Sequence, residues 1–521
     1  MAGYKAFQSK FMGSELLFSE DYVAFESRKL RYSILWAMYE NTAYSKMHAW
    51  AQGYKSEYGL YKYIRNIYNP SYRIGEFWKA HLLGGQLDAQ AGDGTKVPSC
   101  LPILTDNDAL REAIAQIWAW SNWQVKKDIL GLWTPVMGDG VIKIVDNPDK
   151  QKVYMTVLNP GTLKYVDLDP FGNVKGYVLE ERRRDPRKGR NNANSTSIST
   201  VTYREVAERN GDSVVYSTYL DDGLYAWNEN QGAQWEESYG FVPLVVFQHN
   251  NVGLDFGWAE LYPGLPKFRE VDDQASKLND QIRKLVDTPM LMAGVTKPGT
   301  QPQVAGAEKT DDKPQPGREE VPYIYTANAD AKAIPLVGDL NIADTSTHIQ
   351  TLLAEIEQDY PELSADLHNV QGDISGRALR LNRAPAEDKV IQRRPNYDDA
   401  IVRAQKMAVS IGGMRNYFPF SLDSFNAGDL EHSIGKRPVF AKDPQDDIDE
   451  ETAFWAAANQ AKAFGIPPLV YLRQKGWSDE KIADIEKSPE YMARIKALEN
   501  LNIANSTPPT NDPFKKKQAS Q

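Results

Sequence analysis

The feature that most constrains this chain is a narrow apolar stripe on an otherwise charged, helix-forming segment. Pro266 fits the first turn of a helix, and a heptad pattern then extends from Lys267 to Asp287. Such a stripe covers only one edge of a rod about 32 Å long, so it needs a helical neighbour rather than a broad core. Either the chain's own returning helix or an identical subunit can supply that neighbour. The stripe consists of Phe268, Val271, Ala275, Leu278, Ile282 and Leu285.

A second helix with one apolar face is expected after an insert. Seven prolines between Pro289 and Pro335 prevent the first helix from continuing. Three short β-like runs lie in this insert, at Met290–Val295, Val321–Thr326 and Ala333–Val337. The pattern predicts a two-helix stalk with a small mixed tip. The returning helix ends at Pro361, and its apolar face carries Ile349, Leu352, Leu353, Ile356 and Tyr360.

The first 262 residues change from helical to strand periodicity. We expect a helix over Tyr22–Met38 and another, capped by Asp106 or Asn107, that continues through Val125 towards Leu132. The apolar period then falls to two residues, which is typical of strands. The fold class predicted is therefore α+β. The expected strands are Val141–Val145, Val153–Val157, Val174–Leu179, Val201–Val206, Ser213–Tyr219 and Val242–Phe247.

The C-terminal part is expected to be mainly helical. A long helix interrupted by Pro385 and Pro395 reaches about Met414, and the segment Arg377–Arg415 holds nine basic and four acidic residues. A strand-like run, Pro438–Phe440, follows it. Three more helices and a polar, disordered tail complete the chain. These helices are expected at Asp446–Phe464, Pro467–Lys475 and Ser478–Glu486.

The chemistry of the chain argues against an enzyme. The single cysteine, Cys100, excludes multi-cysteine metal sites, and no phosphate-binding loop or nucleophile elbow occurs. Phe171 and Val178 replace ligands in an EF-hand-like run, which predicts a turn. Acid pairs such as Asp272-Asp273 are interpreted as solvated faces. We therefore expect no catalytic residue, metal or cofactor.

The net charge and the hydropathy of the chain further restrict the kind of protein that it can be. The formal net charge is −10, which argues against a protein that simply adheres to DNA. No apolar run approaches the ~20 residues that span a bilayer, so we expect no membrane partner. The start, from Met1 to Lys10, is polar and lacks an apolar run, so we expect no secretory signal.

Five motifs follow one another along the chain: Val157–Thr162, Tyr239–Val245, Phe256–Leu261 with Thr288–Leu291, Asp373–Leu379, and Gly465-Ile466 with Trp477. In this order they resemble the motifs of the portal proteins, or head-to-tail connectors, of tailed bacteriophages of the siphophage and podophage type. The wing-like run is Val157–Thr162, and Gly465-Ile466 with Trp477 is similar to the crown. Gly257-Trp258 reverses the family's usual Trp-Gly order. The most specific stretch extends from Tyr239–Val245 through Phe256–Leu261 and the heptad helix to Thr288–Leu291, and Asp373–Leu379 is similar to the family's helix entry after the tunnel loop.

The resemblance implies a dodecameric ring at one capsid vertex, through which double-stranded DNA is packaged and ejected. Its implied partners are further copies of itself, the major capsid protein, the terminase large subunit, a head–tail adaptor protein and transient, non-sequence-specific DNA. Assembly would take place in the bacterial host cytoplasm and the product would lie in the virion. The implied regions are a wing (1–262), stem helix 1 (263–288), clip (289–340), stem helix 2 (341–361), tunnel loop (362–376), long kinked helix with a wing return strand (377–442), crown (443–500) and disordered tail (501–521).

Two sets of residues carry the expected function. The stripe residues would join subunits of the ring. The tunnel loop and the helix after it would face DNA, through His368, Asn369, Gln371, Asp373, Arg377, Arg380 and Arg383. Alternatively, these arginines pair with carboxylates of a neighbouring subunit.

Two rival functions stay open from the sequence. One is a non-portal structural protein of the virion. The other is a metal-dependent DNA-processing enzyme built on carboxylates such as Asp149, Glu180 and Glu181.

Overall fold

The chain folds into two compact units, residues 1–440 and 441–521, which are described separately. The first mixes helices and sheets around one hydrophobic core, and the fold class is α+β as predicted. The second holds the helices α12 (Pro444–Ala463), α13 (Pro468–Gln474) and α14 (Asp479–Lys487), as expected. This computed structural model describes residues 25–44, 67–84, 87–187, 199–228, 231–286, 290–293, 323–326, 332–335, 342–364, 376–440, 444–463, 468–474, 479–493 and 496–497.

The helices before the large sheets bury several large aromatic side chains. α2 (Phe25–Tyr39) and α5 (Ser71–His81) precede α6 (Asp108–Ser121), which Asn107 caps by accepting from the amide of Leu110 at 3.3 Å. The capping prediction is confirmed. Because aromatic rings supply large buried areas, they dominate this part of the core. The fully buried tryptophans of this region are Trp78, Trp118 and Trp123.

The predicted continuous helix through Val125 is wrong, because the chain turns at Asn122. Asn122 has a left-handed φ of 53°, and its amide donates to the carbonyls of Trp118 and Ala119. Asparagine tolerates this conformation better than most residues. A separate helix, α7 (Trp123–Met137), therefore starts in a new direction.

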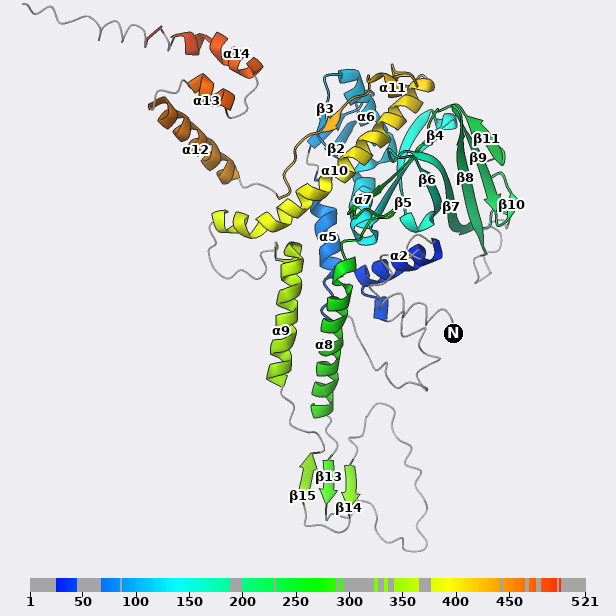
Figure 1. The fold of residues 1–521 in the computed structure, drawn as a ribbon, viewed down its shortest axis with the longest axis vertical. Helices are drawn as coiled ribbons and strands as arrows, with labels where there is room; N and C mark the ends of the chain where they lie inside the picture. The colour runs from blue at the N-terminus through cyan, green and yellow to red at the C-terminus, as the bar shows by residue number, and fades with distance from the viewer. Residues whose placement is uncertain are drawn as a thin grey trace, which may run out of the picture. The chain divides into compact units, whose positions relative to one another are not determined.

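Two antiparallel sheets form the β-rich part of the first unit, and the six predicted strands are confirmed (Figure 1). One sheet has the order β10-β9-β8-β7-β6, with β11 also paired to β9; the other has the order β12-β4-β5. α6, α7 and α10 contact the three-stranded sheet. The strands are β4 (Asp139–Asn147), β5 (Lys152–Leu158), β6 (Leu163–Leu168), β7 (Val174–Arg184), β8 (Thr200–Asn210), β9 (Ser213–Leu220), β10 (Gly223–Leu224), β11 (Gln234–Glu237) and β12 (Leu244–Gln248).

Short elements connect these sheets as the turn sequences predicted. The EF-hand-like run forms the β6–β7 turn, where Asp169 accepts from the amides of Phe171 and Asn173 at 2.8 Å. The other short helices are η4 (Pro148–Lys150), η5 (Pro160–Thr162), η6 (Tyr262–Gly264), η7 (Pro361–Leu363) and α11 (Ser424–Ala427).

The return strand lies elsewhere than predicted. β16 (Ser433–Ile434) pairs with β3 (Ile103–Leu104), whereas Pro438–Phe440 forms no strand. The carbonyls of Arg437 and Pro438 accept hydrogen bonds from the guanidinium of Arg394. These carbonyls are therefore satisfied by a side chain and not by pairing with a strand. A separate two-stranded sheet joins β1 (Leu87–Gln90) and β2 (Lys96–Cys100).

The predicted helix pair and its β insert are present. α8 (Leu265–Val286) and α9 (Ile342–Asp359) lie side by side in Figure 1 and contact each other. Between them in the chain is a three-stranded sheet of order β14-β13-β15, in which β13 and β14 are parallel. Its strands are β13 (Met290–Ala293), β14 (Tyr323–Thr326) and β15 (Lys332–Pro335).

The long helix is also confirmed. α10 (Gly376–Met414) contains 39 residues, with Pro385 and Pro395 inside it, and it bends along its length in Figure 1. A proline inside a helix removes one backbone donor and clashes with the preceding turn, which accounts for the bend.

One acidic residue of α8 is not on a solvated face, so that expectation is wrong for it. Asp272 is fully buried, and its Oδ1 accepts the amides of Ile67 at 2.9 Å and Tyr68 at 2.8 Å. The carboxylate therefore fastens the chain before α5 to α8. Burial raises the pKa of Asp272 to about 6, although the two amides act in the opposite direction.

Replacing Asp272 by Asn should remove a pH-dependent part of the stability. The folded-state pKa lies above the unfolded value, so the folded wild type binds the extra proton and loses stability as pH rises from about 4 to 6. A shift of this size corresponds to about 3 kcal/mol. Denaturant unfolding at several pH values should show that the stability of Asp272→Asn rises relative to that of the wild type over this range. Parallel pH profiles of the two proteins would contradict the raised pKa of Asp272.

Candidate functional site

The stripe of α8 is buried at its start and progressively uncovered towards its end. Phe268 and Val271 are 1% exposed and Ala275 is 5% exposed, Leu278 is half-buried, and Ile282 is 39% exposed. The side chain of Leu285 lies outside the described residues. The structure thus brings the first three stripe residues into the chain's own core.

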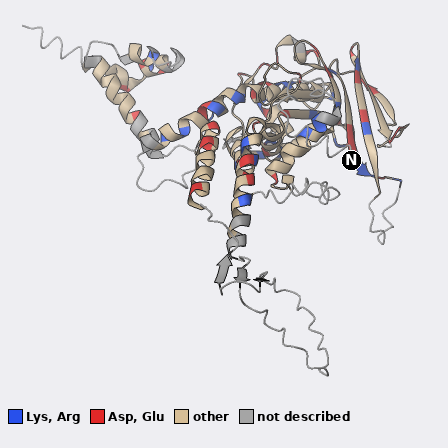
Figure 2. Ribbon diagram, turned by 60° about the horizontal axis from the view of Figure 1, so that its bottom comes forward, with Lys and Arg blue, Asp and Glu red and all other residues tan. Residues whose placement is uncertain are grey.

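The returning helix supplies part of this cover, as one of the two alternatives anticipated. The rings of Phe268 and Tyr360 lie 5.4 Å apart, and Lys267 pairs with Asp359 at 2.5 Å. α9 has four acidic residues and no lysine or arginine, whereas α8 mixes both signs (Figure 2). Charge complementarity therefore adds to the apolar contact between the two helices.

The predicted DNA-facing residues are only partly described. Those of the loop, His368, Asn369, Gln371 and Asp373, lie outside the described residues, as does the side chain of Arg377. Arg380 is exposed on α10. The Arg383 guanidinium lies 4.8 Å from the centre of the Phe440 ring, so a cation–π contact within the chain holds this arginine.

A buried charge cluster, which we call the junction cluster, joins the stalk helices to α10. The Nζ of Lys389 lies 2.6 Å from Glu260 Oε1 and 3.1 Å from both carboxylate oxygens of Glu362. Glu260 lies shortly before η6, which leads into α8, and Glu362 lies in η7, shortly after the end of α9. One ammonium of α10 therefore holds both roots of the stalk.

His249 extends the junction cluster to β12. Its Nε2 lies 2.9 Å from Glu260 Oε2, and its Nδ1 lies 2.7 Å from the hydroxyl of Tyr397 on α10. Burial lowers the pKa of His249 below its ordinary value. We therefore assign a neutral imidazole that donates from Nε2 to Glu260 and accepts the Tyr397 hydroxyl at Nδ1.

The charge states of the other residues of the junction cluster follow from their neighbours. Burial alone would raise the pKa of Glu260, but the bond from His249 and the charge of Lys389 lower it. Burial raises the pKa of Glu362, and the neighbouring Glu260 adds to this. The two carboxylates outweigh burial and raise the pKa of Lys389. Glu260, Glu362 and His249 are at most 8% exposed, so the cluster holds elements together and offers no surface for a substrate.

The carboxylates of the rival nuclease hypothesis do not converge. Glu180 pairs with Lys164 at 2.7 Å, and Glu181 pairs with Arg183. Because they are neighbours on β7, their side chains point to opposite faces of the sheet. Asp149 lies in η4. Within the described residues, no cluster of three or more His, Cys, Asp or Glu is placed to hold a metal.

No family model matches the chain, and no curated protein matches its sequence. None of the helices in the described part of the chain is both long and apolar enough to cross a membrane.

Replacing Lys389 by Met should strongly destabilise the first unit. Two buried carboxylates would lose their cation, and breaking a buried pair in this way costs about 3–5 kcal/mol. Thermal unfolding and limited proteolysis after residues 260 and 362 would measure the loss. Lys406→Met is the matched control on α10, because Lys406 pairs with the exposed Glu431 and should cost less than about 1 kcal/mol. Equal losses in both variants would contradict the role of the junction cluster.

Proposed function

We propose that this chain is a portal protein: a homo-dodecameric ring at one vertex of a tailed-bacteriophage capsid, through which double-stranded DNA is packaged and ejected. The observation that carries the proposal is the helix pair α8 and α9, interrupted by a small three-stranded sheet, with a stripe that the described part of the chain buries at the root and leaves progressively exposed as far as Ile282. The sequence motifs that resemble the portal family occur in order around this pair.

Apolar side chains that the single chain leaves exposed support assembly into a ring. Ile282 on α8 is 39% exposed, and Leu381 and Ile391 on α10 are 68% and 50% exposed. Burying such side chains between identical subunits would gain roughly 25 cal/mol for each Å² removed from water. A ring offers every subunit two such neighbours, so both helices can be covered.

The charge distribution fits a conduit that does not retain its cargo. Of the basic residues in the first half of α10, Lys389 belongs to the junction cluster and Arg394 binds the carbonyls of His81 and Leu82. Arg377 and Arg380 are proposed as contacts with DNA because the sequence resemblance implies that this part of α10 faces the channel. Each phosphate that a protein neutralises adds salt-dependent affinity, so a few arginines in an acidic chain favour weak, transient contact.

The remaining partners follow from the portal proposal. The insert between α8 and α9 would bind first the terminase large subunit and then a head–tail adaptor protein. The major capsid protein would surround the ring in the virion, after assembly in the host cytoplasm. The protein is proposed to have no catalytic activity of its own.

The ring can be tested by imaging and by one substitution. Electron micrographs of the purified protein should show rings of about twelve subunits with a central hole. Ile282→Asp should leave the subunit folded, because this side chain lies outside its core, but place a charge in the subunit interface and yield monomers by native mass measurement. Lys277→Asp, about 140° around the same helix, is the control and should still form rings.

Two outcomes would contradict this assignment. Solid assemblies without a hole would favour a non-portal structural protein of the virion. Intact rings from Ile282→Asp would show that the exposed end of the stripe plays no part in assembly.

The DNA contact can be tested separately with Arg380→Glu. If Arg380 faces the channel, rings should form normally and package less DNA, with a defect that diminishes as salt screens the added charge. If Arg380 instead pairs with a neighbouring subunit, ring yield itself should fall. Lys436→Glu, an exposed position outside α10, is the control. Normal ring yield together with normal packaged length would remove Arg380 from the channel.

A further inference from the structure

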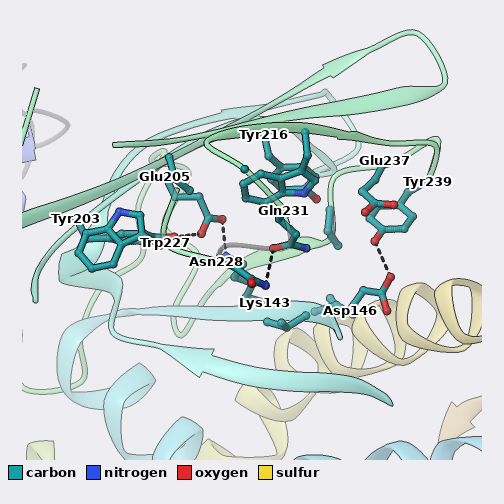
Figure 3. A pocket seen from close by; sticks show the side chains of 16 residues that line it. Lys143, Asp146, Tyr203, Glu205, Tyr216, Trp227, Asn228, Gln231, Glu237 and Tyr239 are labelled. Atoms are coloured by element: carbon teal, nitrogen blue, oxygen red, sulfur yellow. Dashed lines mark hydrogen bonds and ion pairs between the residues drawn. The ribbon is translucent and has the colours of Figure 1, made fainter. Parts of the chain in front are cut away.

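The C-terminal part of α10 is fixed to both main sheets of the first unit. It carries buried side chains such as Met407 and Ile411, and Arg415 directly follows the helix. Arg415 donates to Asp146 Oδ2 at 2.7 Å and to Glu237 Oε2 at 2.9 Å. These two carboxylates, from β4 and β11, lie in the wall of a cavity of about 230 Å³ between the sheets (Figure 3). This end of α10 is therefore held in place from both sheets.

Two exposed prolines divide the rest of α10. A proline has no amide hydrogen, so the carbonyl four residues before it receives no helical hydrogen bond. Pro385 and Pro395 create two such points inside the helix. Helices bend more readily at these positions. Residues 386–394 therefore form a short piece of helix between two bending points, which we call the proline-bounded segment.

The stalk is attached to the proline-bounded segment through Lys389. In the junction cluster, the Nζ of Lys389 lies 2.6 Å from Glu260 Oε1, before α8, and 3.1 Å from both carboxylate oxygens of Glu362, after α9. Ala386 and Val390 on the same segment are fully buried. A displacement of the stalk roots would therefore act directly on this segment.

The chain that leads towards the second unit is attached to the same segment through Arg394. Residues 437–440, which we call the connector, end the first unit and belong to no helix or strand. Arg394 donates to the carbonyl of Arg437 at 2.6 Å and to that of Pro438 at 3.2 Å. The connector is thus held by a side chain of the proline-bounded segment where a strand would be held by a sheet.

Further contacts hold the last two residues of the connector. The Nδ1 of His81, at the end of α5, lies 2.9 Å from the carbonyl oxygen of Val439, which can only accept, so this nitrogen donates. The ring centre of Phe440 lies 4.8 Å from that of His81 and 4.8 Å from the Arg383 guanidinium. α5 and α10 therefore hold the connector together.

We propose that the proline-bounded segment is a mechanical coupler between the stalk and the connector. Lys389 and Arg394 lie about 140° apart around the helix and about 7.5 Å apart along it, so they hold partners on different sides. Because both residues belong to one stretch of helix between two bending points, a tilt that begins at Lys389 also displaces Arg394, and the reverse. The proposal goes beyond the portal function and does not depend on it.

Hydrogen exchange on the full chain tests the coupling from the side of the stalk. Glu362→Gln removes one charge that Lys389 holds and leaves every connector contact in place. We expect the amides of Val439 and Phe440 to exchange about fivefold faster, the lower end of typical coupling between two sites. The acceleration is counted relative to the amides of β9, which report a general loss of stability. Lys406→Met, on the same helix, is the matched control and should leave the connector amides unchanged.

The reverse experiment uses Arg394→Met. The amide of Leu363 donates to the carbonyl of Tyr360 at 2.9 Å next to the stalk root. Because coupling between two sites is reciprocal, this amide should also exchange about fivefold faster relative to β9. If circular dichroism shows that Arg394→Met does not fold, Arg394→Lys replaces it, since lysine keeps the charge but lacks the fork that binds several carbonyls.

α5 offers a second route between the same two places, and the test must separate it from α10. Arg73, near the start of α5, donates to the carbonyl of Leu363 at 2.9 Å, and His81 at its end holds the connector. Glu362→Gln is therefore also compared with the wild-type residue in an Arg73→Met background. An acceleration of the connector amides that persists there supports the coupler in α10, and its loss would overturn it. Unchanged relative exchange in either direction would overturn the coupling itself.

Discussion

Much of the first unit depends on a single ammonium group buried between two carboxylates. Lys389 reaches Glu260 before α8 and Glu362 after α9, so three segments far apart in the chain meet at one charge. A buried ion pair has a large desolvation cost, and this one is offset by several hydrogen bonds, including those through His249 and Tyr397. The arrangement gives the junction a defined geometry that apolar packing alone would specify less strictly.

The junction also explains why the stalk can be exposed beyond its root. Phe268 and Val271 are held by the core next to the cluster, whereas Ile282 near the end of α8 has no such support within the described chain. Heptad patterns show that a helix needs a neighbour but not which molecule provides it. Here the same stripe serves the subunit's own fold at one end and leaves an apolar surface at the other.

Periodicity predicted the elements well, because each repeats a local pattern. The strands from Val141 to Phe247 and the helices α8, α9 and α10 follow directly from periods of two and of three to four residues. The break at Asn122 was missed because a single left-handed residue can interrupt a helix without disturbing the apolar spacing around it. The pairing of β16 with β3 was missed because two-residue strands have no period.

The candidate sites were harder to predict than the elements. Asp272 resembled a solvated acid because its partners, the amides of Ile67 and Tyr68, lie about 200 residues away. Lys389 and Asp146 stand alone in the sequence, and only the fold brings their partners to them. The described residues therefore leave the loop from His368 to Asp373 as a prediction from sequence, while the junction cluster and the cavity come from the structure.

The graded burial of α8 has a mechanical consequence. A rod fixed at one end and less covered at the other acts as a lever, in which a small tilt at the fixed end becomes a larger displacement at the tip. Over a helix of 22 residues, or about 33 Å, a tilt of 5° moves the far end by about 3 Å. Any rearrangement that shifts Lys389 relative to Glu260 would therefore be amplified along α8 towards the β13–β15 insert that follows it in the chain.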